Sequence, residues 1–507
     1  MGMTNKGAGG TPRDREALAV GALLLLLFLV NVLTADLFPV VWLDEALHVD
    51  PAVSLFRGEG LRSTTWGGQP VTETWVGYTP LFAIALAGWM RLFGFGLTVV
   101  RAFGHALGLV AVGAVWLGVR RHGLLRTSRA RLLLVLLASC GAGASFSYRC
   151  GRPDPLLFLL FAAGFLASTV RGRAARTGLL LSAGSLVPAA GFQGLAFAVL
   201  FGALVVLFVR GKALEAVLVF LSGCGLGLAA FVATLSGLGL WSRFREVTLA
   251  ANGIGAGLLD AAAARLELFP QVAIEDPSTV LLLVLCVGTL ALAAREGRGR
   301  SLAPALFGAL AAVLVPTALC AAGRWALYYS WMSWVPLVVG TLVSMEALEG
   351  LHRPGRPFRL LLAASVLVGL PLQLALGLFD AKARSYRRVE EVVAAGVPHG
   401  AVAYCDAAAY YAVRARASRL FLPSYNRHLT AANLQSIDAV VLRTGDGFSW
   451  EKPHPAIEAA FRPLDVPAPP ASRAKAFRLH WIYGDYATLR AWEKRPPAPL
   501  PSASAGR

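Results

Sequence analysis

The sequence predicts an α-helical protein that crosses a membrane many times and carries a small α/β domain near its C-terminus. Of its 507 residues, 56% are hydrophobic and 15% are charged, whereas soluble domains average about 45–50% apolar and about 25% charged residues. The mean hydropathy is +0.61. About eleven apolar runs approach the ~20 residues that a helix needs to cross the hydrocarbon core. This composition excludes a soluble globular protein.

The predicted spans begin near the N-terminus and continue to residue 379. The first follows the basic residues Lys6, Arg13 and Arg15, is longer than the apolar part of a secretory signal and precedes no clear small-residue cleavage site. We therefore expect this span to be retained as an anchor. The spans are expected at residues 17–38, 99–119, 131–148, 155–171, 177–191, 194–210, 213–240, 277–294, 302–322, 328–349 and 359–379.

The apolar stretch "PLFAIALAGWMRLF", residues 80–93, is too short to be a span. Its 14 residues reach about 21 Å as a helix, less than the ~30 Å core. We expect a juxtamembrane or re-entrant helix here. The N-terminus and the arginine-rich loops then share one side of the membrane, which the positive-inside rule makes the cytoplasm. We therefore predict a multi-pass protein of the inner (plasma) membrane with a cytoplasmic N-terminus.

The formal net charge of +18 follows from this topology. The arginines gather in short loops between apolar runs, as they do in cytoplasmic loops, so we expect no nucleic-acid partner. The six cysteines are scattered, without a CxxC pair or zinc-ligand spacing. We interpret them as packing residues.

Three regions are expected along the chain. Residues 1–380 form the membrane domain, with a first outer loop at 39–98. Residues 381–495 are polar and alternate short strand and helix patterns, such as "GAVAYCDAAAYYAVRA" and "IDAVVLRT", which predicts a small α/β domain outside the membrane. Residues 496–507 are rich in Pro, Ser and Ala and are expected to be disordered.

The first outer loop opens with a cluster of acidic and metal-capable side chains, "WLDEALHVD". In a helix, His48 lies one turn from Asp44, and Glu45 lies beside Asp44. Such a cluster can hold a divalent metal ion or tune one carboxylate. It is also typical of an ordinary interfacial helix, whose first turn favours acidic residues. The local sequence leaves both interpretations open.

A second cluster, "YRCGRPDPLLFLL", places Arg149, Arg152 and Asp154 at the outer mouth of two predicted spans. Asp154 is positioned either to take part in chemistry at this mouth or simply to cap the next helix and pair with an arginine.

A third cluster, "GRWALYYSWMSW", lies at another outer mouth and puts Arg324 before Tyr328 and Tyr329. Aromatic residues at this depth often form an interfacial belt. A guanidinium near the headgroups, by contrast, is suited to binding a phosphate through two hydrogen bonds.

Together these clusters put carboxylates on one outer loop and arginines on two others, beside a lipid phase. That combination suits attack by an acceptor hydroxyl on a sugar whose leaving group is a lipid phosphate. The carboxylate accepts the proton of the hydroxyl, and fixed positive charge stabilises the departing phosphate.

The same motifs, in the same order, resemble the polyprenyl-phosphate-dependent glycosyltransferases of the GT-C type. This superfamily includes protein O-mannosyltransferases and the enzymes that transfer aminoarabinose or galacturonic acid to lipid A. The resemblance covers most of residues 17–380. It implies a GT-C like helical bundle with an outward cavity, a lipid-linked donor and inversion at the anomeric carbon. It also implies that Asp44, with Glu45 beside it, and Asp154 are the catalytic residues.

Two positions depart from the family pattern. Thr79 and Gln193 stand where many of these relatives carry lysine. We therefore expect the donor phosphate to be bound by Arg149, Arg152 or Arg324, with Tyr328, Tyr329 and His48 as further substrate contacts. No cofactor is certain, and a divalent metal ion remains an open alternative.

The predicted function is transfer of a sugar from a polyprenyl-phosphate donor to a lipid, glycan or protein acceptor on the outer face. Membrane lipids are the other expected partners. The alternatives are a transporter or flippase of lipid-linked glycans, and an assembly subunit whose α/β domain binds a partner. A transporter usually carries ionisable residues at the middle of its spans, and few interrupt the spans here.

Overall fold

The computed structural model describes residues 12–208, 212–250, 273–297, 299–321, 326–349, 355–444, 452–464 and 485–495. The chain divides into two compact units. The first comprises residues up to Ala35, Tyr78–Phe93 and Thr98–Leu376, and the second comprises Asp36–Gly77, Gly94–Leu97 and the chain from Gly377 onward. The sequence analysis assigned the loop 39–98 to the membrane domain, but most of that loop belongs to the C-terminal unit.

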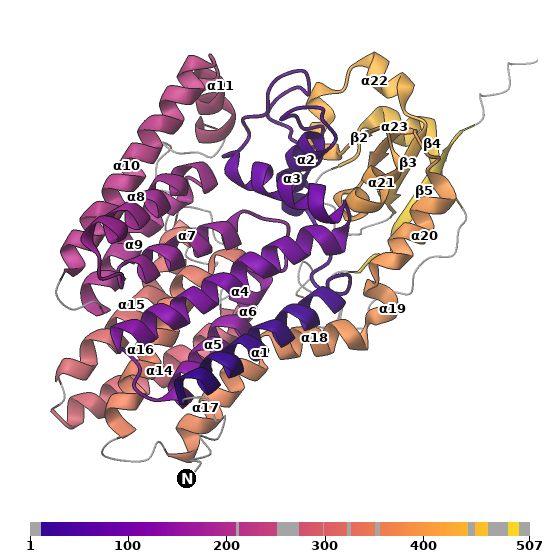
Figure 1. Ribbon diagram of the computed structural model, residues 1–507. Coiled ribbons are helices and arrows are strands. Elements are labelled where there is room, and N and C mark those ends of the chain that lie inside the picture. The colour runs from indigo at the N-terminus through magenta and orange to yellow at the C-terminus, as the bar shows by residue number, and fades with distance from the viewer. Residues whose placement is uncertain are drawn as a thin grey trace, which may run out of the picture. The chain divides into compact units, whose positions relative to one another are not determined.

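The first unit is a bundle of helices (Figure 1). Its elements are α1 (Pro12–Leu33), α3 (Leu81–Phe93), α4 (Leu97–His122), α5 (Ser128–Cys140), α6 (Ala142–Tyr148), α7 (Asp154–Ala167), α8 (Arg173–Ala190), α9 (Gln193–Phe208), α10 (Ala213–Gly237), α11 (Trp241–Phe244), the π-helix η1 (Arg245–Ala250), α14 (Pro277–Arg295), α15 (Gly299–Ala321), the 3₁₀ turn η2 (Leu327–Tyr329), α16 (Trp331–Glu349), α17 (Arg356–Leu367) and α18 (Leu370–Phe379), whose last turn belongs to the second unit.

Six helices in the described ranges are long and apolar enough to cross a membrane, namely α1, α4, α10, α14, α15 and α16. The bent pairs α5–α6 and α17–α18 raise this to eight if each is one span. The protein is therefore a multi-pass membrane protein. Helices also occupy the other predicted spans, but α7 and α9 are short and α8 lies outside this set, so the number eleven remains a prediction.

The helix α3 has 13 residues, which is too short to cross the core.

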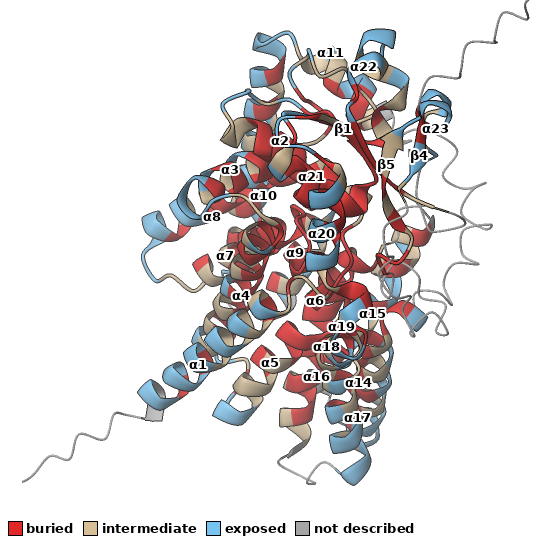
Figure 2. Ribbon diagram, turned by 90° about the vertical axis from the view of Figure 1, so that its right-hand side faces the viewer, coloured by how far each residue is buried: buried red, intermediate tan, exposed pale blue. Residues whose placement is uncertain are grey.

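The surface of α1 shows most clearly that the bundle faces lipid, because only 17% of the residues in its most apolar stretch are buried. Figure 2 shows much of α1 in pale blue. Exposed leucines on a helix of this length are stable only in contact with lipid or another protein.

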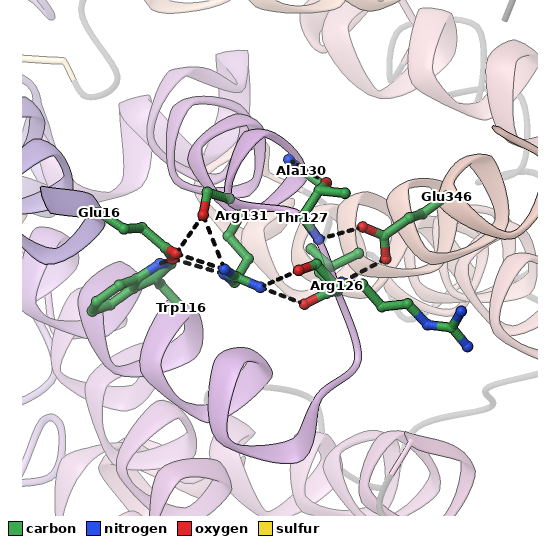
Figure 3. Close-up of polar contacts among 9 residues, drawn as sticks. Glu16, Trp116, Arg126, Thr127, Ala130, Arg131 and Glu346 are labelled. Atoms are coloured by element: carbon green, nitrogen blue, oxygen red, sulfur yellow. Dashed lines mark hydrogen bonds and ion pairs between the residues drawn. The ribbon is translucent and has the colours of Figure 1, made fainter. Parts of the chain in front are cut away.

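An ion pair joins the beginnings of α1 and α5. The guanidinium of Arg131 donates two hydrogen bonds to the carboxylate of Glu16, with N–O distances of 2.7 and 2.5 Å (Figure 3). The indole N–H of Trp116, near the end of α4, donates to the same carboxylate at 3.1 Å. The Arg131 and Glu16 side chains are only 12% and 3% exposed. An ion pair that is this little exposed is stable because its remaining polar atoms are also hydrogen-bonded.

A second carboxylate caps the turn before α5. Glu346, near the end of α16, accepts hydrogen bonds from the backbone N–H groups of Arg126 and Thr127, both at 2.7 Å. N–H groups at a helix start have no partner within the helix, so a carboxylate is favourable there. The start of α1, the end of α4, the start of α5 and the end of α16 therefore share one end of the bundle. The sequence analysis placed these segments on a common side.

The second unit is built around a five-stranded sheet (Figure 1). The strand order is β2-β1-β3-β5-β4; β2, β1 and β3 are parallel, and β5 runs antiparallel to β3 and β4. Its elements are α2 (Leu43–Phe56), α19 (Ala381–Arg384), α20 (Tyr386–Gly396), β1 (Val402–Cys405), η3 (Ala407–Ala409), α21 (Tyr410–Arg416), β2 (Arg419–Phe421), η4 (Pro423–His428), α22 (Ala431–Ser436), β3 (Ala439–Arg443), α23 (Pro455–Ala460), β4 (Phe461–Pro463) and β5 (Leu489–Lys494). The predicted disordered tail, 496–507, lies outside the described residues.

The sheet has its own apolar core. Tyr404 of β1, Phe421 of β2 and Val440 of β3 are all nearly inaccessible to solvent and pack in one cluster. These parallel strands consist largely of apolar residues because both of their faces are covered. The unit therefore holds its strands, and the turns at their ends, in fixed positions.

We expect the substitution Arg131→Ala to lower the thermal stability of the bundle. The Glu16 carboxylate would lose its cationic partner while staying buried, and breaking a buried pair costs about 3–5 kcal/mol. The melting temperature of the purified protein in detergent measures the effect. Arg129→Ala is the matched control, because Arg129 lies on the same helix and is exposed. Equal melting temperatures for the two variants would contradict this account of the ion pair.

Candidate functional site

The carboxylates of the first loop lie on α2, in the second unit. Asp44 and Glu45 occupy its first turn, where the helix dipole favours negative charge. Glu45 is fully buried and accepts a hydrogen bond from the hydroxyl of Tyr411 at 3.0 Å. Asp44 is partly exposed. Neighbouring helix residues point about 100° apart, so the two carboxylates face different surroundings although they are adjacent in sequence.

A third acid of α2, Asp50, is also fully buried. It accepts hydrogen bonds from the hydroxyl of Ser63, the backbone N–H of Thr64 and the hydroxyl of Tyr410, at 2.9, 2.9 and 3.0 Å. Arg414 lies 3.5 Å away. Burial and the charge of Asp50 raise the pKa of Tyr410 well above its ordinary value of 10.0, so the hydroxyl remains a donor. Asp50 is therefore a structural carboxylate.

The sequence left open whether Asp44 and His48 take part in holding a metal ion. His48 is buried, and its ring centre lies 6.4 Å from that of Trp66. Among the described residues, no three His, Cys, Asp or Glu side chains are grouped to hold a metal ion.

In the first unit, a buried ion pair precedes α7. Arg152 donates from Nε to Asp154 at 3.0 Å, and the two side chains are 4% and 0% exposed. The carbon atom at the centre of the guanidinium group lies 3.6 Å from the ring centre of Tyr328, a cation–π contact. The ring of Tyr329 lies 4.5 Å from that of Tyr328. Four of the predicted site residues therefore meet at the start of α7 and α16.

Polar groups of a second segment lie beside this cluster. Tyr78 donates its hydroxyl to the side-chain oxygen of Gln193 at the start of α9. Burial, with Tyr329 and Asp154 nearby, raises the pKa of Tyr78 well above its ordinary value. Within the described ranges, the amide nitrogen of Gln193 and the hydroxyl of Thr79 are buried without a hydrogen-bond partner. Buried donors in this state are rare and need an explanation.

The other two predicted arginines are placed differently. Arg149 is fully buried and donates to the side chain of Asn31 and to the carbonyl and hydroxyl oxygens of Thr34, the latter two at 2.8 and 3.0 Å. It therefore fixes the C-terminal end of α1. Arg324 lies outside the described residues, and its predicted role stays a prediction.

An apolar hollow begins roughly one helical turn beyond the ion pair. Phe158 follows Asp154 by one turn on α7, and Trp331 follows Tyr328 by one turn into α16. Their rings lie 5.4 Å apart. The lining is almost wholly apolar and comes from Val115, Phe158, Phe161, Ala162, Phe165, Phe197, Leu200, Phe201, Leu204, Trp331, Met332, Val335, Pro336 and Val339.

Sequence reasoning missed the hollow and the hydrogen bonds that Tyr410 and Tyr411 make to α2. The hollow is formed by side chains on four helices, α4, α7, α9 and α16, which periodicity alone cannot bring together. Thr79 and Gln193 were noticed only as departures from a family pattern. A tyrosine immediately before Thr79 was the available signal for a polar cluster, because a buried tyrosine hydroxyl needs a partner.

We expect Gly191→Ala to disrupt the contact between Tyr78 and Gln193. A Cβ atom at position 191 would lie 2.9 Å from the Tyr78 hydroxyl and 3.0 Å from the Gln193 oxygen. The variant should have a lower melting temperature and a lower activity than the wild-type protein. Gly178→Ala is the control, because nothing lies within 4 Å of its added atom and alanine suits a helix. A Gly191→Ala protein that behaves like the Gly178→Ala protein would contradict the crowding seen here.

Neither a family model nor a curated protein matches the chain. Solved structures do match. The crystal structure of ArnT from Cupriavidus metallidurans bound to undecaprenyl phosphate has 14% sequence identity and a TM-score of 0.50, over 84% of this chain and 93% of that one. An Archaeoglobus fulgidus oligosaccharyltransferase in complex with zinc and sulfate has 14% identity and a TM-score of 0.40, over 82% and 68%. The chain therefore has the fold of ArnT, and the resemblance to GT-C glycosyltransferases is confirmed for the fold.

Proposed function

We propose that the protein is a membrane glycosyltransferase that moves a sugar from a polyprenyl-phosphate donor to a hydroxyl group of a lipid, glycan or protein acceptor. The reaction takes place on the outer face of the inner (plasma) membrane, with the N-terminus cytoplasmic and the α/β unit extracytoplasmic. The main support is the buried arginine at the head of an apolar hollow. The ArnT crystal structure holds undecaprenyl phosphate, a ligand that likewise joins an anionic group to an apolar chain.

The hollow suits the hydrocarbon part of such a donor. Its phenylalanine, leucine and valine lining offers no polar partner, and burying apolar surface stabilises a complex by about 25 cal/mol per Å². A prenyl chain is long, flexible and wholly apolar, so it gains this energy without leaving a polar group unpaired. A soluble nucleotide sugar has no part that would gain from this lining.

Arg152 is the proposed phosphate ligand. Its planar guanidinium is fixed by Asp154 at Nε and by the Tyr328 ring against its face, so little side-chain freedom is lost when a phosphate binds. In this arrangement Asp154 orients the arginine. Tyr329 and, by the sequence prediction, Arg324 complete the donor site.

Tyr78, Thr79 and Gln193 supply neutral donors at the same end. The buried Thr79 hydroxyl and Gln193 amide are suited to the oxygens of a sugar or phosphate, which would satisfy their hydrogen-bonding capacity. Both stand where relatives carry lysine, so the donor site here relies on hydrogen bonds at positions where those relatives use charge.

Asp44 is the proposed general base. Its carboxylate takes the proton of the acceptor hydroxyl while that oxygen attacks the anomeric carbon. The bond from that carbon to the phosphate oxygen breaks, and the polyprenyl phosphate leaves with the electron pair. A phosphate is a weak base, so no general acid is required, and a single displacement inverts the anomeric carbon. His48 lies one turn from Asp44 and is the proposed acceptor contact.

We expect Asp44→Asn to abolish sugar transfer without loss of folded protein. Removing a general base typically lowers the rate by about 10²- to 10⁴-fold. The assay follows transfer from a radiolabelled polyprenyl-phosphate sugar in membranes, after glycan profiling of a deletion strain has identified the sugar. Asp36→Asn makes the same change just before the first outer loop and should keep its activity. A few per cent of residual activity or more in Asp44→Asn would remove Asp44 from the base role.

We expect Ala162→Phe to weaken donor binding selectively, because the larger side chain fills part of the hollow. The KM for a long-chain donor should rise about tenfold, equivalent to roughly 1.4 kcal/mol, with kcat little changed. A donor with a short prenyl chain should be affected less. Ala163→Phe, the neighbouring position outside the lining, is the control. Equal effects on both chain lengths would argue against a lipid site in the hollow.

A further inference from the structure

The helix that carries Asp44 is bound along one side by the C-terminal α/β domain. Two consecutive residues of α21 reach it: Tyr411 donates its hydroxyl to Glu45 and Tyr410 donates to Asp50, each at 3.0 Å. Both carboxylates and both tyrosines are buried. Hydrogen bonds to a charged acceptor are stronger than those between neutral groups, so these two contacts hold both ends of the acidic stretch of α2.

The loop that follows α2 is bound by the same domain. The hydroxyl of Ser424 donates to the carbonyl of Thr65 at 2.5 Å, and the backbone N–H of Val71 donates to the hydroxyl of Tyr425 at 2.6 Å. A Cβ atom at Gly67 would lie 2.1 Å from the carbonyl oxygen of Ser424. The chain can approach this closely only because position 67 has no side chain.

These contacts lie at one particular edge of the sheet. The segment with Tyr410 and Tyr411 follows β1, and the segment with Ser424 and Tyr425 follows β2. The two strands are parallel neighbours, so both segments leave the same edge, which is where open α/β sheets usually bind a ligand. Here the first outer loop of the same chain covers that edge.

We propose that the C-terminal α/β domain is a clamp that positions α2, and that Glu45 is the anchor of this clamp and not a reacting acid. Tyr411 is then a positioning residue that sets the direction of Asp44, the next residue back along the helix. This inference rests on the proposed function of Asp44. The contacts themselves are independent of it.

The burial of the two acids separates their roles. Glu45 is 0% exposed and its carboxylate faces a tyrosine hydroxyl, a position that no acceptor can enter without breaking the clamp. Asp44 is partly exposed. Three hydrogen bonds to Asp50, one of them from Tyr410, and its ion pair with Arg414 hold the following turn of α2.

The test compares Tyr411→Phe with Tyr404→Phe in the full-length protein. Both changes remove one buried hydroxyl from the same domain, but the Tyr404 hydroxyl donates to Asn426 and accepts from the backbone N–H of His454, both in the C-terminal part of the chain. We expect Tyr411→Phe to lower kcat at least tenfold, leave the KM for the donor within twofold, and accelerate amide hydrogen exchange over residues 43–56. Tyr404→Phe should change neither kcat nor the exchange of α2.

Glu45 variants test the anchor directly. Glu45→Gln keeps a side-chain oxygen that accepts from Tyr411, so it should retain activity within about threefold of wild type. Glu45→Ala should resemble Tyr411→Phe, and combining the two should cost no more than either alone, as for two halves of one interaction. If Glu45→Gln is as inactive as Glu45→Ala, Glu45 reacts with substrate and the anchor role is overturned.

Hydrogen exchange keeps the two proposals separable. Unchanged exchange of α2 in Tyr411→Phe would overturn the clamp whether or not the protein transfers a sugar. Suppose instead that Tyr411→Phe accelerates the exchange of α2, but the wild-type protein transfers no sugar from any polyprenyl-phosphate donor. That result would support the clamp and reject only the proposed function. Exchange in β1 and β3 reports whether the variants remain folded.

Discussion

The constraint behind most of this structure is that a buried charge must be paired and hydrogen-bonded. Arg152 is tolerated beside the apolar hollow because Asp154 and the Tyr328 ring compensate its charge. The same rule joins Glu16 to Arg131 at the other end of the bundle. The Glu16–Arg131 pair joins α1 to α5, and the contact of Arg152 with the Tyr328 ring joins the start of α7 to the turn before α16. Charged residues therefore help to determine how the apolar helices are arranged.

The two ends of the bundle are consequently different in kind. At one end, carboxylates meet an arginine and backbone N–H groups, as around Glu16 and Glu346. At the other end, the Arg152–Asp154 pair, the rings of Tyr78 and Tyr328 and the Gln193 amide lie around the start of α7. Among the described residues, the Thr79 hydroxyl and the Gln193 amide nitrogen at that end are buried without a hydrogen-bond partner, so a ligand could satisfy them.

Much of the fold was predictable from the sequence, because an apolar run near 20 residues has few other ways to satisfy its backbone. The resemblance to GT-C glycosyltransferases is confirmed for the fold. The grouping of Arg152, Asp154 and Tyr328 followed from sidedness, since the loops at one face are near neighbours. Most of the first outer loop groups with the C-terminal unit, because its contacts are with segments that follow it by more than 300 residues, and hydropathy does not report such contacts.

The sequence by itself determined that this is a membrane protein, which segments are helical and which polar residues stand at the helix ends. Those properties depend on local hydropathy and spacing. Only the tertiary structure decided that Glu45 is buried against Tyr411, 366 residues away, while its neighbour Asp44 keeps partial exposure. The physical reason is that hydrogen bonds between distant segments form only when the chain packs. Adjacent carboxylates share one local sequence, so only packing can give them different surroundings.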